Sequence, residues 1–185
     1  MKSALILIDI QNEYFPGGAS ELYRPELAAA NTRKLLDYYR EQRLPVYHVQ
    51  HISDYPGATA YLPGSKGAEL YPLVAPLAPE KVFVKHAPNS FYKTGLAEEL
   101  LKQQINHLVI CGMMSHMCVD TTVRAAKDYE FSVTLIDDAC TTKDLSWKEN
   151  IIPAATVHDT MMASINGVFA TVVTADNYLN SCKEQ

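Results

Sequence analysis

The chain has 185 residues, with 16 Lys+Arg and 21 Asp+Glu, which gives a formal net charge of −5. Its 48% hydrophobic and 20% charged residues are enough to form a core, which excludes a mostly disordered protein, and the lack of a long basic run argues against nucleic acid as a partner. No apolar run approaches the roughly 20 residues needed to span a bilayer, so the sequence predicts a soluble, cytoplasmic protein without a membrane partner and with one domain over residues 1–185.

In chain order, short apolar runs alternate with longer segments of helical periodicity, a pattern typical of parallel βαβ units. The predicted strands lie at residues 4–9, 46–50, 81–85, 107–112, 132–137 and 167–172. The predicted helices lie at about residues 25–42, 95–104, 115–129 and 150–163. This alternation predicts an α/β fold with a parallel sheet.

One segment, residues 52–79, does not follow this alternation. It carries five prolines and three glycines, including Tyr-Pro-Gly and Leu-Pro-Gly turn signals. Long irregular segments inside a domain are usually functional, so a lid, a binding loop and an oligomer contact all remain open.

Three residues with reactive side chains follow predicted strands. Asp9 ends the first strand, Lys85 ends the third, and Cys118 lies just beyond the fourth. Parallel sheets bind ligands beyond the carboxyl ends of their strands, which gives these positions functional weight. With Ser115 as the N-cap, Cys118 would sit in the first helical turn, where we expect a lowered thiol pKa.

Each of these residues also has an alternative interpretation. Cys118 could be a small core residue, and Asp9 could cap a loop or pair with a surface base. His48 and His51 flank the end of the second strand without a metal-ligand spacing around them, so we predict no metal. No glycine-rich nucleotide-binding motif is present either, so we predict no cofactor.

Four segments carry a resemblance to a known family. They are residues 9–15 (Asp-Ile-Gln-Asn-Glu-Tyr-Phe), 85–91 (Lys-His-Ala-Pro-Asn-Ser-Phe) with Thr94 and Leu96, 112–122, and 137–140 (Asp-Asp-Ala-Cys). In this order and spacing the chain resembles the isochorismatase-like cysteine hydrolases, a family that includes nicotinamidases and N-carbamoylsarcosine amidohydrolases.

The resemblance implies a three-layer, Rossmann-like fold with a six-stranded parallel sheet flanked by helices. It implies that Asp9, Lys85 and Cys118 form a catalytic triad. It also implies a cis peptide between Met113 and Met114, with the amides of Met114 and Cys118 forming the oxyanion hole.

The chain departs from two branches of that family. Nicotinamidases carry an Asp-x-His zinc motif after the second strand, whereas this chain reads Gln50-His51-Ile52-Ser53. Isochorismatases proper lack the nucleophilic cysteine, so Cys118 favours amide-type hydrolysis over vinyl ether cleavage.

We therefore predict a metal-independent cysteine hydrolase that acts on a small amide, imide or carbamoyl substrate through a thioester. Five residues near the strand ends are candidate substrate contacts, with ordinary loop packing as the alternative: Tyr14, Phe15, Asn89, Phe91 and Tyr92. Relatives of the family are commonly oligomeric, which implies a homodimer or homotetramer. A thiol redox sensor or a non-catalytic ligand-binding protein of the same fold is the alternative, although a bridge between Cys111 and Cys118 is not expected.

Overall fold

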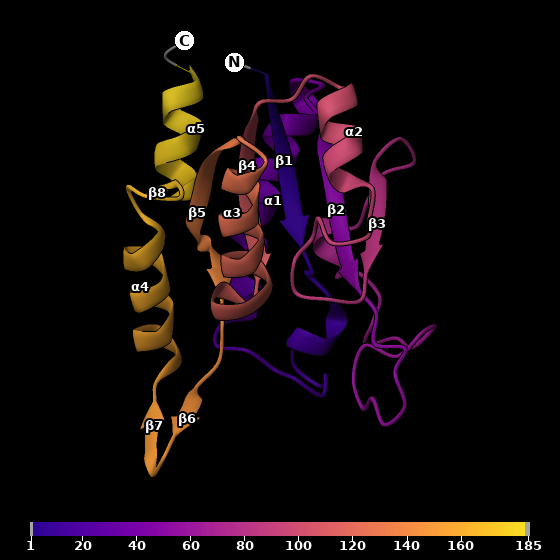
Figure 1. Ribbon diagram of the computed structural model, residues 1–185, viewed down its shortest axis with the longest axis vertical. Helices are drawn as coiled ribbons and strands as arrows, with labels where there is room; N and C mark the ends of the chain where they lie inside the picture. The colour runs from indigo at the N-terminus through magenta and orange to yellow at the C-terminus, as the bar shows by residue number, and fades with distance from the viewer. Residues whose placement is uncertain (1, 184–185) are drawn as a thin grey trace.

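The computed structural model describes residues 2–183. Six parallel strands form the central sheet in the order β3-β2-β1-β4-β5-β8 (Figure 1). The strands are β1 (Ser3–Ile8), β2 (Val46–His51), β3 (Lys81–Lys85), β4 (His107–Met113), β5 (Ser132–Thr141) and β8 (Thr171–Val173). The chain reverses its direction of sheet growth between β1 and β4, and doubly wound folds bind ligands at such a switch point.

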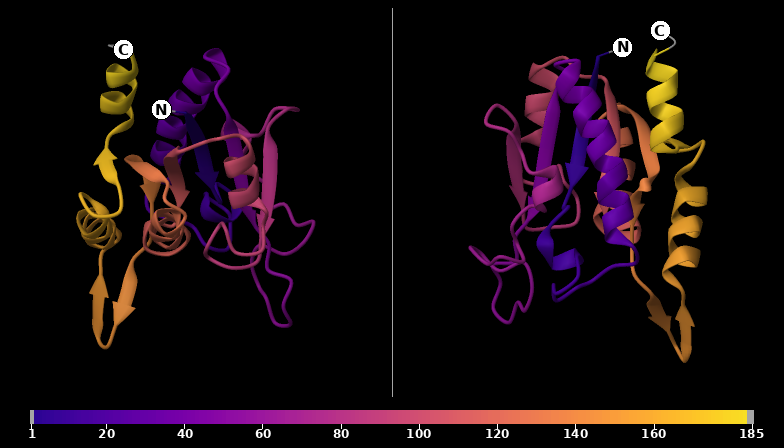
Figure 2. Two further views of the ribbon diagram at one scale, coloured as in Figure 1. Left: turned by 45° about the horizontal axis from the view of Figure 1, so that its top comes forward. Right: turned by 180° about the vertical axis from the view of Figure 1, so that it is seen from behind.

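Helices cover both faces of this sheet and complete three layers (Figure 2). The helices are α1 (Pro25–Glu41), α2 (Leu96–Lys102), α3 (Asp120–Asp128), α4 (Ala154–Ile165) and α5 (Ala175–Lys183). One apolar core contains residues of α2, α3 and α4, while the other contains residues of α1 and α5. The predicted α/β, Rossmann-like fold with a six-stranded parallel sheet is confirmed.

Successive residues of β1 supply the two cores alternately. Ile6 and Ile8 lie in the core under α2, α3 and α4, whereas Leu5 and Leu7 lie in the core under α1. All four side chains are at most 1% exposed. A strand buried on both faces is uniformly apolar, which explains the short apolar run that predicts it.

Two predicted elements near the C-terminus are wrong in extent. The strand predicted at 167–172 is shortened to β8, because Gly167 takes a φ of 79° and the chain turns before entering the sheet. The helix predicted at 150–163 begins at Ala154, after Pro153, and residues 150–152 are extended instead. They form β7 (Asn150–Ile152), which pairs with β6 (Leu145–Trp147) in an antiparallel hairpin.

The β6–β7 hairpin and segment 52–79 both project beyond the carboxyl ends of the strands (Figure 1). They lie on opposite sides of the switch point and leave the ends of β1 and β4 between them. None of the helices in residues 2–183 is long and apolar enough to cross a membrane.

Candidate active site

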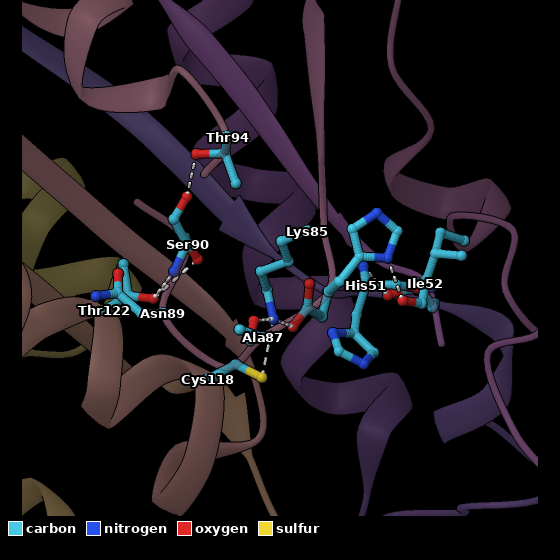
Figure 3. Close-up of polar contacts among 12 residues, drawn as sticks. His51, Ile52, Lys85, Ala87, Asn89, Ser90, Thr94, Cys118 and Thr122 are labelled. Carbon is cyan, nitrogen blue, oxygen red and sulfur yellow. Dashed lines mark hydrogen bonds and ion pairs between the residues drawn. The ribbon is translucent and has the colours of Figure 1, made fainter. Parts of the chain in front are cut away.

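Three side chains from different strand ends meet at the switch point. The Nζ atom of Lys85 lies 2.7 Å from Oδ2 of Asp9 and donates to Sγ of Cys118 at 3.1 Å. Figure 3 shows the lysine side chain reaching toward the sulfur. Lys85 also donates to the carbonyl oxygen of Ala87 at 3.1 Å, so its ammonium group contacts a carboxylate, a thiol and a carbonyl at once.

Unusual backbone conformations surround these groups. Asp9 has a φ of 51°, in the left-handed region that few residues other than glycine adopt. Gly112 has a φ of 136°, and a Cβ atom there would stand 2.1 Å from the carbonyl oxygen of Ile8. The peptide bond between Met113 and Met114 is cis. The ends of β1 and β4 therefore approach each other closely, at a position where only glycine fits.

A hydroxyl network fixes the segment that follows Lys85 against the helix that follows Cys118. Thr122 Oγ1 accepts a hydrogen bond from the Ser90 amide and donates to Ser90 Oγ, at 3.1 and 2.8 Å (Figure 3). Thr94 Oγ1 donates to the Ser90 carbonyl at 2.6 Å. Ser90 and Thr122 are fully buried, so these bonds hold the two segments in one relative position.

Burial controls the protonation of the cluster. Asp9 is 0% exposed and Lys85 is 1% exposed. Burial raises the pKa of Asp9, and the charge and hydrogen bond of Lys85 oppose this effect. Burial would lower the pKa of Lys85, but the charges of Asp9 and Cys118 reverse the shift and leave that pKa raised. The ammonium group of Lys85 favours the ionised form of Asp9, which burial opposes, and the two groups form an ion pair beside the thiol.

The predicted lowering of the Cys118 pKa is wrong. Burial, with the negative charge of Asp9, raises the pKa of this thiol to about 12, although Lys85 opposes the shift. The side chain is only 7% exposed, so the partial charges of a helix end do not compensate for lost solvation. Cys118 therefore rests as a thiol, and its use as a nucleophile requires a base.

The expected N-cap is also wrong. Met114 is the N-cap, with extended φ and ψ of −95° and 147°, and Ser115 is the first residue of a single π-helical turn, η3 (Ser115–Val119). Ser115 Oγ instead forms a hydrogen bond of 2.8 Å with Nδ1 of His158. Because the Ser115 hydroxyl bonds His158 on α4, 43 residues away in the chain, it does not cap the helix start.

The five candidate substrate contacts fall in different environments. Tyr14 is buried, and burial raises its pKa well above the usual range. The charges of Tyr61, Asp9 and Cys118 raise the pKa of Tyr14 further. Phe15 is stacked on Tyr71 with a ring separation of 3.5 Å, inside the α1 core.

The other three belong to the segment after β3. Asn89 Oδ1 accepts a hydrogen bond from the Phe91 amide at 2.9 Å. The Phe91 ring packs against Phe131 in the core, with 6.1 Å between ring centroids. Tyr92 is 54% exposed and carries Lys93 over its ring. Loop and core packing account for all these contacts. Among the five candidates, Tyr14 is the one whose pKa is affected by the charges of Asp9 and Cys118.

Two further residues lie near the cluster and were not among the predicted site residues. His51 pairs with Lys85 in the β2–β3 register, and its Nδ1 is buried without a hydrogen-bond partner among the described residues. Tyr61 presents its ring at 5.5 Å and 84° to His51 and at 5.4 Å to Tyr14. Tyr61 belongs to segment 52–79, where no sequence pattern marks one tyrosine over another.

The histidines and acidic residues of the described chain are candidate metal ligands. Within residues 2–183, no group of three or more His, Cys, Asp or Glu side chains is arranged to hold a metal ion. His48 is buried against Glu80, with Nε2 3.0 Å from Oε2, and is therefore engaged in the interior.

The chain belongs to the isochorismatase family, because the isochorismatase domain matches residues 3–177. It is 46% identical to the uncharacterized isochorismatase family protein YddQ of Bacillus subtilis, over 97% of this chain and 99% of that protein. The crystal structure of an isochorismatase from Pseudomonas putida superposes with a TM-score of 0.90 and 39% identity, covering 95% of this chain and 89% of that one. A more distant relative is the nicotinamidase of Escherichia coli, 26% identical over 74% of this chain and 82% of its own length. The protein is thus a hydrolase of this family.

Proposed function

We propose that the protein hydrolyses a small amide, imide or carbamoyl compound through a thioester on Cys118. The observation that carries the proposal is the contact of one buried ammonium group, on Lys85, with both Asp9 and Cys118. A carboxylate that can accept a proton, a thiol that needs a base and a fixed positive charge between them are the elements of nucleophilic catalysis. The relation to an enzyme named nicotinamidase supports amide hydrolysis.

In the first step, Asp9 accepts the proton of Cys118 Sγ, and the sulfur forms a bond to the substrate carbonyl carbon. The carbonyl π electrons move to oxygen, and the backbone amides of Met114 and Cys118 donate hydrogen bonds to the resulting oxyanion. Lys85 keeps its proton and stabilises the negative charge as it moves from carboxylate to sulfur.

In the second step, the oxyanion collapses, the carbon–nitrogen bond breaks, and Asp9 returns its proton to the leaving nitrogen. Ammonia or an amine departs and leaves an acyl group on Cys118. Asp9 then accepts a proton from water while the hydroxide adds to the thioester. Breakage of the carbon–sulfur bond, with proton return to sulfur, releases the acid and restores the resting cluster.

The geometry opposes the alternative of a disulfide-based redox sensor. Cys111 contributes to the core under α1, whereas Cys118 lies in the core on the opposite face of the sheet. All four cysteines are free, and a bridge between these two would have to cross the sheet.

The test measures ammonia release from a panel of primary amides, imides and carbamoyl compounds, together with the intact mass of the protein during turnover. We expect an acyl adduct that maps to Cys118, and loss of both adduct and turnover in Cys118→Ala. Cys140→Ala is the matched control, since Cys140 is equally buried and lies in the same core. Full turnover by Cys118→Ala would refute the proposal.

A further inference from the structure

Segment 52–79 places one side chain, Tyr61, beside the catalytic cluster. Its ring lies 5.4 Å from Tyr14 and 5.5 Å from His51. Burial raises the pKa of Tyr61 to about 12, hydrogen bonds with Tyr14 and Ser20 oppose the shift, and the charge of Asp9 adds to it. Tyr61 is therefore close enough to Asp9 to sense its charge.

A buried carboxylate fixes the backbone of Tyr61. Glu13 is 8% exposed, and its Oε1 accepts the Tyr61 amide at 3.0 Å while its Oε2 accepts the Ala19 amide at 3.0 Å. Tyr61 has a φ of 56°, a conformation that costs a residue with a side chain about 1 kcal/mol or more. The charge-assisted bond from Glu13 offsets such strain.

The remainder of the segment is shaped around the same carboxylate. A Cβ atom at Gly67 would stand 2.5 Å from Glu13 Oε2, and Gly67 accepts the Glu13 amide through its carbonyl oxygen at 2.8 Å. The Ser53 amide donates to the carbonyl of Tyr61 at 2.9 Å. Glu13 thus connects Tyr61, Gly67 and the loop after β1, so several contacts together fix the position of Tyr61.

The charges around Asp9 and Tyr61 disfavour substrates that carry a carboxylate. Lys85 is the one lysine or arginine that is buried within residues 2–183, and it already contacts Asp9, Cys118 and the Ala87 carbonyl. Burial, together with the positive charge of Lys85, lowers the pKa of His51 to about 4, so this imidazole is neutral at pH 7. A substrate carboxylate near Asp9 would meet a like charge, and the buried cation beside it is already engaged.

We propose that Tyr61 is a specificity-determining residue that selects uncharged, planar amide or imide substrates, and that Glu13 is its positioning residue. The Tyr61 ring flanks the bound substrate beside Tyr14, and its hydroxyl exchanges a hydrogen bond with Tyr14 or Ser20 for one with a polar group of the substrate. The proposal rests on the proposed function for its substrate class.

The first experiment compares the labelling of Cys118 by neutral iodoacetamide and by anionic iodoacetate at one pH, with glutathione in the same solution as reference. It needs no substrate, so it is informative even if no amide is hydrolysed. We expect the preference of Cys118 for iodoacetamide to exceed that of glutathione at least tenfold. Tyr61→Ala should bring the two within about threefold, because removal of the ring admits water that screens the charge of Asp9. A wild-type preference equal to that of glutathione would overturn the proposal.

The second experiment measures kcat and KM with benzamide and with its anionic analogue 4-carbamoylbenzoate, or with the neutral and anionic forms of whichever amide the panel identifies. Loss of one hydrogen bond in Tyr61→Phe is expected to raise KM for the neutral amide about threefold to tenfold, with kcat changed less. Tyr55→Phe is the control, because Tyr55 lies in the same segment and is 63% exposed.

Glu13→Gln tests the positioning role by placing an amide NH₂ against a backbone N–H. We expect KM to rise and the alkylation preference to fall as in Tyr61→Ala, while Glu21→Gln, on an exposed side chain, leaves both unchanged. Turnover that depends on Cys118 but is unaffected by Tyr61→Ala and Glu13→Gln would refute this inference and leave the proposed function standing. Absence of any turnover, with an alkylation preference that still depends on Tyr61, would refute the proposed function and leave only the selection of uncharged ligands by Tyr61 standing.

Discussion

Lys85 and Asp9 form an ion pair of 2.7 Å between two side chains that are both 0% exposed. The pair joins the end of β3 to the end of β1, across the intervening strand β2. Removal of the pair therefore affects how the carboxyl ends of these strands are held together, as well as the proposed chemistry.

We predict that Lys85→Met destabilises the protein by about 3 to 5 kcal/mol, because Asp9 is left as an uncompensated buried charge. The double variant Asp9→Asn with Lys85→Met should recover much of this loss, since the buried charge is gone. Urea unfolding of the wild type, both single variants and the double variant measures the coupling. Strictly additive losses would show that the two charges do not depend on each other.

The second prediction concerns the pH dependence of Cys118 alkylation. Because burial and Asp9 raise its pKa to about 12, labelling of Cys118 should require higher pH than labelling of glutathione. Asp9→Asn removes a charge that disfavours the thiolate and keeps Lys85, which favours it, so the profile should move to lower pH. Lys85→Met should move it upward. Site-resolved mass spectrometry across pH 6 to about 10 reads these profiles, and faster labelling in Lys85→Met than in Asp9→Asn would contradict the assigned electrostatics.

The third prediction concerns the contact between β1 and β4. Gly112→Ala should cost about 3 kcal/mol or more, because the added methyl group meets the carbonyl of Ile8 and the backbone cannot move without opening the sheet. Gly57→Ala is the matched control: Gly57 also has a positive φ, of 86°, but nothing lies within 4 Å of its missing Cβ. The control should lose only about 1 kcal/mol. Thermal unfolding compares the two, and equal losses would refute the steric explanation.

The fourth prediction concerns acid stability. Burial alone would raise the pKa of Glu80, but hydrogen bonds from Arg40, the Leu77 amide and His48 lower it to about 2. Since the folded pKa lies below the ordinary value of 4.5, this carboxylate stabilises the fold above pH 4.5, and the contribution disappears as the pH falls toward about 2.

Glu80→Gln should therefore lose up to about 3 kcal/mol at neutral pH, and the deficit should shrink between pH 4.5 and about 2. Glu98→Gln, at an exposed position of α2, should match the wild type throughout. Urea titrations at a series of pH values provide the comparison. A deficit that stays constant with pH would exclude linkage to this carboxylate.

Sequence reasoning succeeded where a strand is a short apolar run. Strand β1, buried on both faces, and the edge strand β3, which is largely exposed, are both such runs, so their ends, at Asp9 and Lys85, could be located within a residue. The same reasoning placed Cys118 next to them, because the end of β4 is equally clear.

It failed where tertiary contacts determine the local structure. Strands β6 and β7 have three residues each, too few for a periodic pattern, and β7 was absorbed into the predicted helix. Ser115 has the composition of an N-cap, but its hydroxyl bonds His158 on α4. The Cys118 pKa depends on how completely other segments cover the thiol, which no local motif reports. Tyr61 reaches the site through a bond to Glu13, 48 residues away in the chain.

The reactive groups stand on the ends of sheet strands, whereas Tyr61 beside them comes from an irregular segment that is held by hydrogen bonds to residues 10–13 after β1, the Glu13 carboxylate among them. These two parts of the molecule are under different constraints during evolution. Residues at the strand ends cannot change without disturbing the sheet, but segment 52–79 can be reshaped between the residues that hold it. A change of selectivity within this fold can thus arise in that one stretch of chain while the reaction is inherited.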